Sequence, residues 1–483
     1  MMNTRVASKS LLLAVAMALG CGSNELKVTG EGGVPGSGGV PGTGGTSSWV
    51  GSRGAVACVG DPSALGSLGL QAMPAVVAPG QSTTLRWDSH VATTLTIDPG
   101  IGSVLGKTSQ VVTPAQTTTY TLTLNGTLQD KVTVTVTQRA FARTGSMASA
   151  RSNHTSTLLP NGKVLVAGGS NQGQALVTAE LYDPATGTFY PTGIMTAARF
   201  SHTASLLVNG KVLIVGRSIG TGLASAEIYD PASNTFVATG RPATGRESHT
   251  ATLLASGKVL IAGGISGLNG LTSAELFDPA TGIFSTAGNM TVARYQHSAT
   301  LLPSGKVLLV GGYVPATDTG NNDGLSSAEL YDPMTGDFEA TGSCGKRVAP
   351  AATLLSDGTV LVGGGWHGFE GYFNSNSLGL YDPASGQSLS TGPLAVSRAL
   401  FSMTLLADGS LLIAGGLQHN NGSADGYLAN AEIYAPTTRT STLTACMTEA
   451  RYSHTATLLT DGRLLVAGGR GSGADLASAE LYQ

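Results

Sequence analysis

The residues best suited to chemistry in this sequence are arginine, histidine and glutamate, which recur at fixed spacing between residues 150 and 480. A guanidinium, an imidazole and a carboxylate brought together could perform general acid–base catalysis. An active site needs one such set, however, whereas this set is repeated. We therefore expect Arg–Glu pairs within or between repeats, with histidine bonded to backbone groups, and such pairs are costly to break singly. The residues are Arg151, Arg199, Arg246, Arg294, Arg347, Arg398 and Arg451; His154, His202, His249, His297 and His454; and Glu180, Glu227, Glu275, Glu329, Glu432 and Glu480.

Other chemistry finds little support in the residue types. Charged residues make up 11% of the chain, the net charge is −3 and no basic patch stands out, so no nucleic-acid partner is expected. No nucleophile elbow, P-loop or zinc-binding phrase occurs. The acidic spacing of NNDG, residues 321–324, fits no calcium loop. We expect neither a cofactor nor a metal.

Aromatic and histidine side chains gather in three long segments that lie between predicted strands: residues 313–326, 366–376 and 417–428. Exposed aromatic rings in loops are typical of contacts with sugar rings or of protein-binding hot spots. The same rings could instead pack on one another as a small core within the loops. The candidate binding residues are Tyr313, Trp366, His367, Phe369, Tyr372, Phe373, His419 and Tyr427.

These segments belong to a unit that is repeated seven times, with a period of about 47–53 residues. The first copy contains four β-like runs: HTSTLLP, GKVLVAGG, TAELYDP and TGTFYPTG. One such unit per four-stranded sheet predicts a β-propeller. In an antiparallel sheet the second-to-third loops and the fourth-to-first connections share one face. The three long segments should therefore lie on one rim of that face.

The repeat resembles the kelch motif over about 340 residues. The resemblance rests on a double glycine after the second run and an aromatic residue in the third. It implies an all-β, seven-bladed kelch β-propeller. The second copy departs from it at Arg217, and the fifth has Leu389 where the fourth-run aromatic should stand. The glycines are Gly168–Gly169, Gly263–Gly264, Gly311–Gly312, Gly364–Gly365, Gly415–Gly416 and Gly468–Gly469, and the aromatics are Tyr182, Tyr229, Phe277, Tyr331, Tyr381, Tyr434 and Tyr482.

Kelch propellers include copper-radical oxidases that resemble galactose oxidase. Sites of that kind need a Tyr-His dipeptide, a second tyrosine, another histidine and a cysteine linked to tyrosine. This sequence has no Tyr-His dipeptide, and its nearest phrases, YQH and YSH, belong to the repeat. The resemblance therefore does not extend to copper-radical chemistry.

The propeller is predicted to span residues 139–483 and to be closed by its own N-terminal strand. The chain stops at SAELYQ, without a fourth run after its last third run. Upstream of the first copy, RAFARTGSM matches GTFYPTGIM, which is the fourth run of copy one with its flanks. We expect residues 140–145 to complete the last sheet, because an open ring would leave unpaired strand edges.

The N-terminal residues resemble a bacterial lipoprotein signal. Residues 1–20 contain Arg5, Lys9 and a short apolar run, and Cys21 follows directly after small residues. The resemblance implies lipidation at Cys21, although Ala18 stands where that family prefers leucine; an ordinary signal cleaved nearby is the alternative. The Gly-rich residues 21–67 are then a lipid-anchored linker with too little apolar surface to fold.

Residues 68–138 alternate threonine with apolar residues, which predicts strands with one buried and one wet face. The phrases PGQSTTLRW and TPAQTTTYTLT resemble the bacterial immunoglobulin-like β-sandwich, with Trp87 and Tyr120 as core aromatics. We interpret this small domain as a spacer. An exported protein could also pair two cysteines, and Cys344–Cys446 is one option.

These observations favour a non-catalytic binding lipoprotein of the bacterial cell envelope. It would be lipid-anchored, in the outer membrane or at the cell surface, and would bind protein or glycan. An enzyme that acts on polysaccharide through an unrecognised site is the alternative, because propellers support both kinds of function.

Overall fold

The computed structural model describes residues 69–483 except 74, 78–81, 89–92, 137–138, 219–221, 223, 315–323, 368–372 and 419–425. The predicted signal peptide of residues 1–20 and the linker of residues 21–67, which begins at Cys21, lie outside the described residues. All regular elements in the described part are β-strands, as the all-β prediction requires. No helix there is long and apolar enough to cross a membrane.

The first described unit consists of two sheets around one core. Their strand orders are β1-β3-β6 and β2-β8-β7-β4-β5. Trp87 and Tyr120 are 2% and 5% exposed and belong to that core, as expected. In β3 and β4 buried and more exposed residues alternate, because successive side chains of a strand point to opposite faces. The bounds are β1 Gln71–Met73, β2 Val76–Val77, β3 Thr83–Arg86, β4 Leu95–Asp98, β5 Gly102–Ser103, β6 Ser109–Val112, β7 Thr118–Leu124 and β8 Leu128–Val136.

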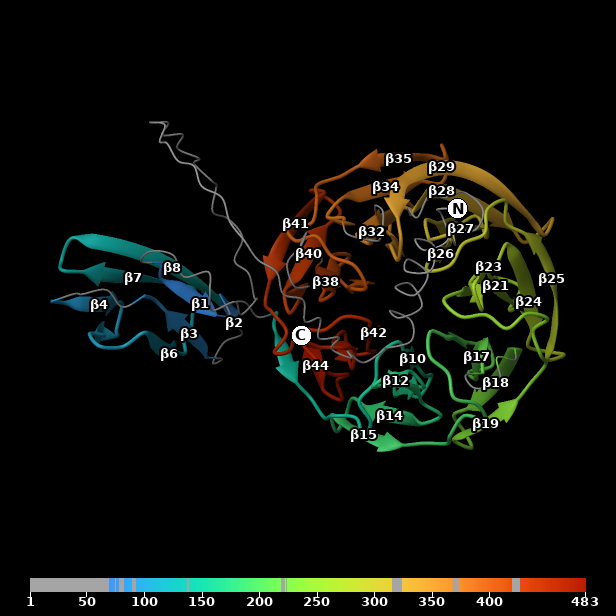
Figure 1. The fold of residues 1–483 in the computed structure, drawn as a ribbon, viewed down its shortest axis with the longest axis horizontal. Coiled ribbons are helices and arrows are strands. Elements are labelled where there is room, and N and C mark those ends of the chain that lie inside the picture. The colour runs from blue at the N-terminus through green and yellow to red at the C-terminus, as the bar shows by residue number, and fades with distance from the viewer. Residues whose placement is uncertain are drawn as a thin grey trace, which may run out of the picture.

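The remaining described residues form seven four-stranded antiparallel sheets, arranged in a ring (Figure 1). We call them blades one to seven, in the order of their first strands. Blades one to four are β10 (Thr155–Leu158), β11 (Val164–Ala167), β14 (Ala179–Asp183) and β15 (Thr188–Pro191); β16 (Thr203–Leu206), β17 (Val212–Arg217), β18 (Ala224–Asp230) and β19 (Thr235–Ala238); β20 (Thr250–Leu253), β21 (Val259–Ala262), β24 (Ser273–Asp278) and β25 (Ile283–Asn289); β26 (Ser298–Leu301), β27 (Val307–Val310), β28 (Leu325–Asp332) and β29 (Asp337–Arg347). Blades five to seven are β30 (Ala351–Leu354), β31 (Val360–Gly363), β34 (Leu378–Asp382) and β35 (Gln387–Ser390); β36 (Ser402–Leu405), β37 (Leu411–Ala414), β40 (Ala431–Ala435) and β41 (Thr440–Thr444); β42 (Thr455–Leu458), β43 (Leu464–Ala467), β44 (Ala479–Tyr482) and β9 (Phe141–Arg143).

The core lies between neighbouring blades. The second strand of a blade, such as β11 or β43, is apolar and buried along its whole length, because a blade inside the ring is covered on both faces. The first strands are half-buried and lie innermost, and each contacts the first strands of its two neighbours. Contacts run from β10 through to β42 and back to β10, so the ring is closed.

The fourth strand of blade seven comes from the start of the ring. Strand β9 pairs antiparallel with β44, with Phe141 opposite Tyr482 and Arg143 opposite Glu480. The rings of Phe141 and Tyr482 lie 4.9 Å apart between centroids, as do those of Phe277 and Phe284 in blade three. Arg139, just before β9, forms an ion pair of 2.5 Å with Asp408 of blade six. The edge of β44 is therefore covered.

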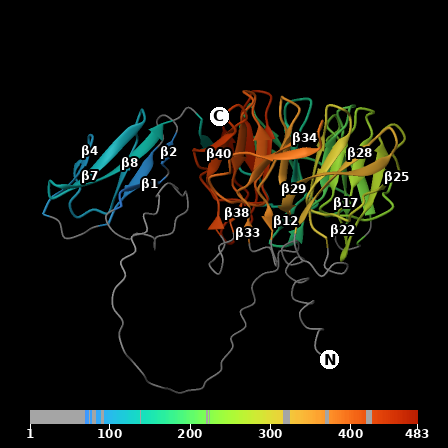
Figure 2. The same ribbon diagram turned by 90° about the horizontal axis from the view of Figure 1, so that it is seen from above.

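The ring has two faces with different connections. The loop face carries the second-to-third loops and the fourth-to-first connections, and the turn face carries the short first-to-second and third-to-fourth turns. Four small hairpins extend from the loop face, all on the same side of the ring (Figure 2). They are β12–β13 (Ser170–Asn171, Gln174–Ala175), β22–β23 (Ile265–Ser266, Asn269–Gly270), β32–β33 (Trp366–His367, Phe373–Asn374) and β38–β39 (Leu417–Gln418, Gly426–Tyr427).

The Cys344–Cys446 disulfide considered from the sequence is not present, because Cys344 is a free and buried thiol. Its side chain packs with the apolar core between blades four and five. Burial raises the pKa of this thiol above its ordinary value, so it behaves as a small apolar residue.

Candidate functional site

The repeated Arg–Glu pairs form inside six of the seven blades and are part of the scaffold. In blade four, Arg294 Nη2 lies 2.6 Å from Glu329 Oε1, and Arg294 Nη1 donates to the carbonyl of Gly311 at 2.8 Å. Glu329 Oε2 accepts the backbone N–H of Thr291 at 2.7 Å. The pair therefore fastens the incoming fourth-to-first connection to the third strand. Equivalent pairs are Arg151–Glu180, Arg199–Glu227, Arg246–Glu275, Arg398–Glu432 and Arg451–Glu480.

The five repeated histidines join neighbouring blades, but not through backbone groups as the sequence led us to expect. That expectation was wrong, because the first residue of the preceding first strand offers a nearer partner, its side-chain hydroxyl. His202 Nε2 and Thr155 Oγ1, for example, share a hydrogen bond of 3.1 Å. The others are His154–Thr455, His249–Thr203, His297–Thr250 and His454–Ser402, at 2.9–3.0 Å.

These histidines are neutral in the folded protein. Burial, together with the positive charge of nearby arginines, lowers the pKa of His202, His297 and His454 to about 3. Burial also lowers the pKa of His154 and His249 well below the usual range. A general base needs a pKa near the working pH and access to a substrate. The buried histidines meet neither condition, so their role is to hold blades together.

The loop face has a narrow ring of backbone at its centre, which we call the mouth belt. It consists of the residue two positions after each repeated arginine, and all seven have positive φ, between 49° and 54°. In six cases the N–H of one belt residue bonds the carbonyl of a belt residue in the neighbouring blade, at 2.9–3.1 Å. The bonds give this uncommon backbone conformation a structural basis. The mouth belt is Asn153, Ser201, Ser248, Gln296, Ala349, Leu400 and Ser453.

Aromatic side chains surround the mouth belt in blades four to seven. The backbones of Tyr295 and Tyr313 form an isolated antiparallel β-bridge. Their rings lie edge to face, with 5.4 Å between the centroids. Tyr427 and Tyr452 stack at 5.7 Å, from blades six and seven. The backbone of Trp366 forms an isolated antiparallel β-bridge with Val348, the residue just before Ala349 of the mouth belt. Burial raises the pKa of Tyr295 and Tyr313, so both hydroxyls stay protonated at neutral pH.

The sequence-predicted binding residues are only partly within the described structure. Tyr313, Trp366, His367 and Tyr427 are half-buried on the loop face. For Phe373 the backbone is described, and it pairs with His367. Phe369, Tyr372 and His419 lie outside the described residues.

Sequence reasoning missed Tyr295 and Tyr452. Both follow a repeated arginine directly and were therefore assigned to the scaffold. The available signal was the variability of this position within the repeat, because the other five copies have serine, phenylalanine, glutamate, valine and alanine there.

A further ion pair on the loop face explains the broken double glycine of blade two. Arg217 stands where other blades have glycine, and its Nη2 lies 3.1 Å from Glu247 Oε1 of blade three. Burial raises the pKa of Glu247, and Arg217 opposes this shift. The pair links two blades in addition to the repeated contacts, so Arg217 has a structural role.

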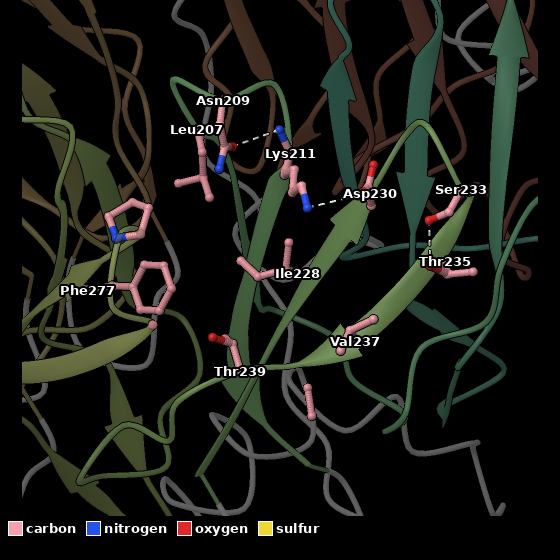
Figure 3. A pocket seen from close by; sticks show the side chains of 13 residues that line it. Leu207, Asn209, Lys211, Ile228, Asp230, Ser233, Thr235, Val237, Thr239 and Phe277 are labelled. Carbon is pink, nitrogen blue, oxygen red and sulfur yellow. Dashed lines mark hydrogen bonds and ion pairs between the residues drawn. The ribbon is translucent and has the colours of Figure 1, made fainter.

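A hollow of about 400 Å³ lies on the turn face between blades two and three (Figure 3). Leu207, Ile228, Val237 and Phe277 supply apolar walls. Its polar groups bond one another: Lys211 pairs with Asp230 at 2.9 Å, and Ser233 bonds Thr235 at 2.7 Å. With these groups already paired, the hollow offers little to orient a ligand.

Comparison with known proteins supports the kelch resemblance. A family model for the kelch motif matches residues 151–196. A solved fungal alcohol oxidase of the AA5 family, in complex with copper, is similar with a TM-score of 0.56 and 18% identity, over 71% of this chain and 75% of that one. The solved structure of YjhT is similar with a TM-score of 0.47 and 14% identity, over 58% of this chain and 93% of that one. No curated protein sequence matches the chain.

The copper of the alcohol oxidase raises the question of a metal centre here. The described residues contain no group of three or more His, Cys, Asp or Glu side chains that could hold a metal ion. The five repeated histidines each bond a hydroxyl across a blade joint, through Nε2. The described residues therefore do not fit a copper centre, and the similarity is one of fold.

Proposed function

We propose that this chain, which folds as a β-propeller and matches the kelch motif over residues 151–196, binds protein or glycan, without catalysis, on the loop face of blades four to seven. The fold alone does not decide this function, because propellers host both enzymes and binding proteins. The proposal therefore rests on which residues the repeat requires and which it does not.

One observation carries the proposal: aromatic side chains that the repeat does not require lie beside the mouth belt on a rigid frame. Trp366 and Tyr313 are half-buried, and Tyr427 and Tyr452 form a stacked pair. Rigid aromatic rings supply contact area at low cost in conformational entropy, and they dominate many binding hot spots. By contrast, the repeated arginine, histidine and glutamate side chains are buried and already bonded.

The test is a binding screen with the full chain against a glycan array and a cell-envelope extract. The key variant is Trp366→Ala, and the control is Met334→Ala, which removes a side chain 91% exposed on the turn face of blade four. We expect Trp366→Ala to weaken binding about thirtyfold, which corresponds to about 2 kcal/mol, and Met334→Ala to leave it unchanged. Equal binding by both variants would exclude the loop face, and turnover of a polysaccharide would exclude a non-catalytic role.

We also propose that lipid on Cys21 anchors the protein in the cell envelope, with residues 21–67 as the tether. The support is the short apolar run that ends at Cys21 and the glycine-rich sequence behind it. Replacing Cys21 with serine should release the protein from membranes. Membrane sedimentation of that variant, together with a wild-type N-terminus free of lipid by mass spectrometry, would contradict the anchor.

A further inference from the structure

One joint of the mouth belt is open. Belt bonds connect Ser201 N–H with Asn153, Ser248 N–H with Ser201, and so on around the ring. Between blades five and six, the N–H of Leu400 and the carbonyl of Ala349 do not bond each other, and no other described residue bonds either group. The bonds on both sides of this joint are present: Ala349 N–H to Gln296 at 2.9 Å, and Ser453 N–H to Leu400 at 3.0 Å.

The residue types at this joint explain the opening. Phe401 occupies the position of the repeated histidine, and Ala351 occupies the position of the hydroxyl that the histidine bonds elsewhere. A Cβ added to Gly364 would clash with the Phe401 ring, just as one added to Gly168 would clash with the His202 ring. The phenylalanine therefore fills the same place as a histidine, but it cannot form the bond that draws two blades together.

The joint between blades four and five shows that a histidine is not essential, provided that another bond replaces it. Pro350 stands at the histidine position there, and its carbonyl accepts a hydrogen bond from the Ser298 hydroxyl. The belt bond of that joint is made. Only the joint between blades five and six, among the described residues, lacks both the cross-blade side-chain bond at this position and the belt bond.

The open joint presents a backbone donor and a backbone acceptor to the mouth of the ring. Ala349 and Leu400 are half-buried, so part of each residue is open to solvent at this point of the belt. Unpaired backbone groups gain from any partner that satisfies both of them. A hydroxyl group donates and accepts through a single oxygen atom, so one hydroxyl placed between Leu400 N–H and Ala349 C=O would complete the belt.

The joint is bordered by an aromatic side chain and a polar amide side chain. Trp366 pairs with Val348, next to Ala349, and so lies on the blade-five side. Across the joint, Asn374 Nδ2 donates to the carbonyl of Leu417 at 2.6 Å, and its Oδ1 is buried without a partner. An aromatic side chain beside a few convergent polar groups is typical of small-molecule sites.

We propose that the open joint between blades five and six is a subsite for a hydroxyl group of a glycan, with Trp366 alongside the sugar ring. The inference rests on the proposed function and narrows its ligand from protein or glycan to glycan. A glycan fits better than a peptide, because one hydroxyl oxygen can accept from Leu400 N–H and donate to Ala349 C=O, whereas a peptide backbone needs two separate groups, a carbonyl and an N–H, to do the same.

Hydrogen exchange on the full chain tests the subsite without any mutation. The probes are neutral oligosaccharides of three to six hexose units. In the free protein, the amide of Leu400 should exchange faster than that of Ser201, the equivalent residue of a closed joint. A bound oligosaccharide should slow exchange at Leu400 and leave Ser201 unchanged. Unaltered exchange at Leu400 with an oligosaccharide bound would overturn the subsite.

Closing the joint gives a second test. Phe401→His combined with Ala351→Thr recreates the side-chain pair of the other joints and should bring Leu400 N–H onto Ala349 C=O. We expect at least tenfold weaker binding of the oligosaccharide. The matched control, His249→Phe with Thr203→Ala, opens a joint far from Trp366 and should not alter binding.

The outcomes separate the subsite from the broader function. Undiminished binding by the closed-joint variant, together with loss of binding in Trp366→Ala, would reject the subsite and keep the loop face as the binding surface. A wild-type chain that captures an envelope protein but none of the oligosaccharides would reject the glycan. Failure to bind either class would reject the proposed function itself. If the closed-joint variant does not fold, the exchange measurement decides.

Discussion

The closed joints of the ring and the open joint between blades five and six use the same backbone but differ in two side chains. At a closed joint such as that of blades one and two, a histidine bonds a hydroxyl and a belt N–H bonds a belt carbonyl. At the open joint, Phe401 and Ala351 replace these partners and both bonds are lost. The comparison shows that repeated polar residues build the ring, whereas a departure from the repeat leaves two backbone groups without a partner among the described residues.

Blade five departs from the repeat a second time. Gly379 stands where the other blades have glutamate, so Arg347 has no carboxylate partner among the described residues. Its guanidinium donates instead to neutral acceptors, among them Ser377 Oγ and the carbonyl of Cys344, both at 2.8 Å. Removing a buried arginine that has only neutral partners should cost less free energy of unfolding than removing one from an ion pair, because no buried carboxylate is left unpaired. Blade five is therefore the least regular of the seven in its polar contacts.

Removal of β9 should have the largest effect on stability, because β9 is the fourth strand of blade seven and joins the two ends of the ring. A chain that starts at Met147 lacks β9 and exposes the edge of β44. We expect loss of cooperative unfolding, or aggregation through the free edge. The control starts at Arg139 and keeps both β9 and the ion pair with Asp408. Identical thermal unfolding curves for the two chains would show that β9 is dispensable.

Removal of a repeated arginine should have the next largest effect and should depend on the blade. Arg294→Ala leaves Glu329 buried without its partner, and we expect a loss of about 3–5 kcal/mol in the free energy of unfolding. Arg347→Ala leaves only neutral groups unpaired, so its cost should be about 1–3 kcal/mol. Urea unfolding of both variants measures the difference. A larger loss from Arg347→Ala would mean that the carboxylate is not what makes these arginines important.

Much of this architecture could be predicted from the sequence, because the same strand pattern occurs in seven copies and each copy supports the assignment of the others. The position of the third-strand aromatics and the completion of blade seven by the strand that precedes the first copy followed from aligning one copy with another. The partner of each histidine did not follow, because it lies on another blade and its position depends on how the blades pack. A repeat also hides variation inside it, which is why Tyr295 and Tyr452 were assigned to the scaffold.

The open joint could not be predicted for a related reason. Phe401 and Ala351 are visible departures in the sequence, but the belt is made of backbone groups, which no residue type reveals. Its seven positive-φ residues are asparagine, serine, glutamine, alanine and leucine rather than glycine, so composition gave no sign of them. Only the three-dimensional pairing of N–H and carbonyl groups shows which joint is incomplete.

Closing or opening a joint should change stability by a smaller amount. Phe401→His with Ala351→Thr adds a side-chain bond and a belt bond, each worth about 0.5–1.5 kcal/mol, and should raise the free energy of unfolding. His249→Phe with Thr203→Ala removes the equivalent bonds from a closed joint and should lower it by a similar amount. Urea midpoints provide the comparison. Opposite signs for the two variants are essential, and equal signs would mean that packing, not hydrogen bonding, distinguishes the joints.

The smallest effect should be a difference in pH dependence between these same variants. In the folded chain the pKa of His202, His297 and His454 lies at about 3, whereas an unfolded histidine titrates near 6.5. Below pH 6.5 the unfolded chain therefore binds protons that the folded chain does not bind. The stability due to neutral histidines is complete above pH 6.5 and is lost progressively as the pH falls toward 3.

Each buried histidine contributes at most about 1.4 kcal/mol per pH unit to this loss. The measurement belongs between pH 7 and pH 5, because the Asp408 carboxyl, with a pKa lowered to about 2, titrates well below that range. The wild type carries five such histidines, His249→Phe with Thr203→Ala carries four, and Phe401→His with Ala351→Thr carries six. The slope of unfolding free energy against pH should be smallest for the variant with four histidines, intermediate for the wild type and largest for the variant with six. A sixth histidine that leaves the slope unchanged would show that the joint between blades five and six stays open to water even with the repeat restored.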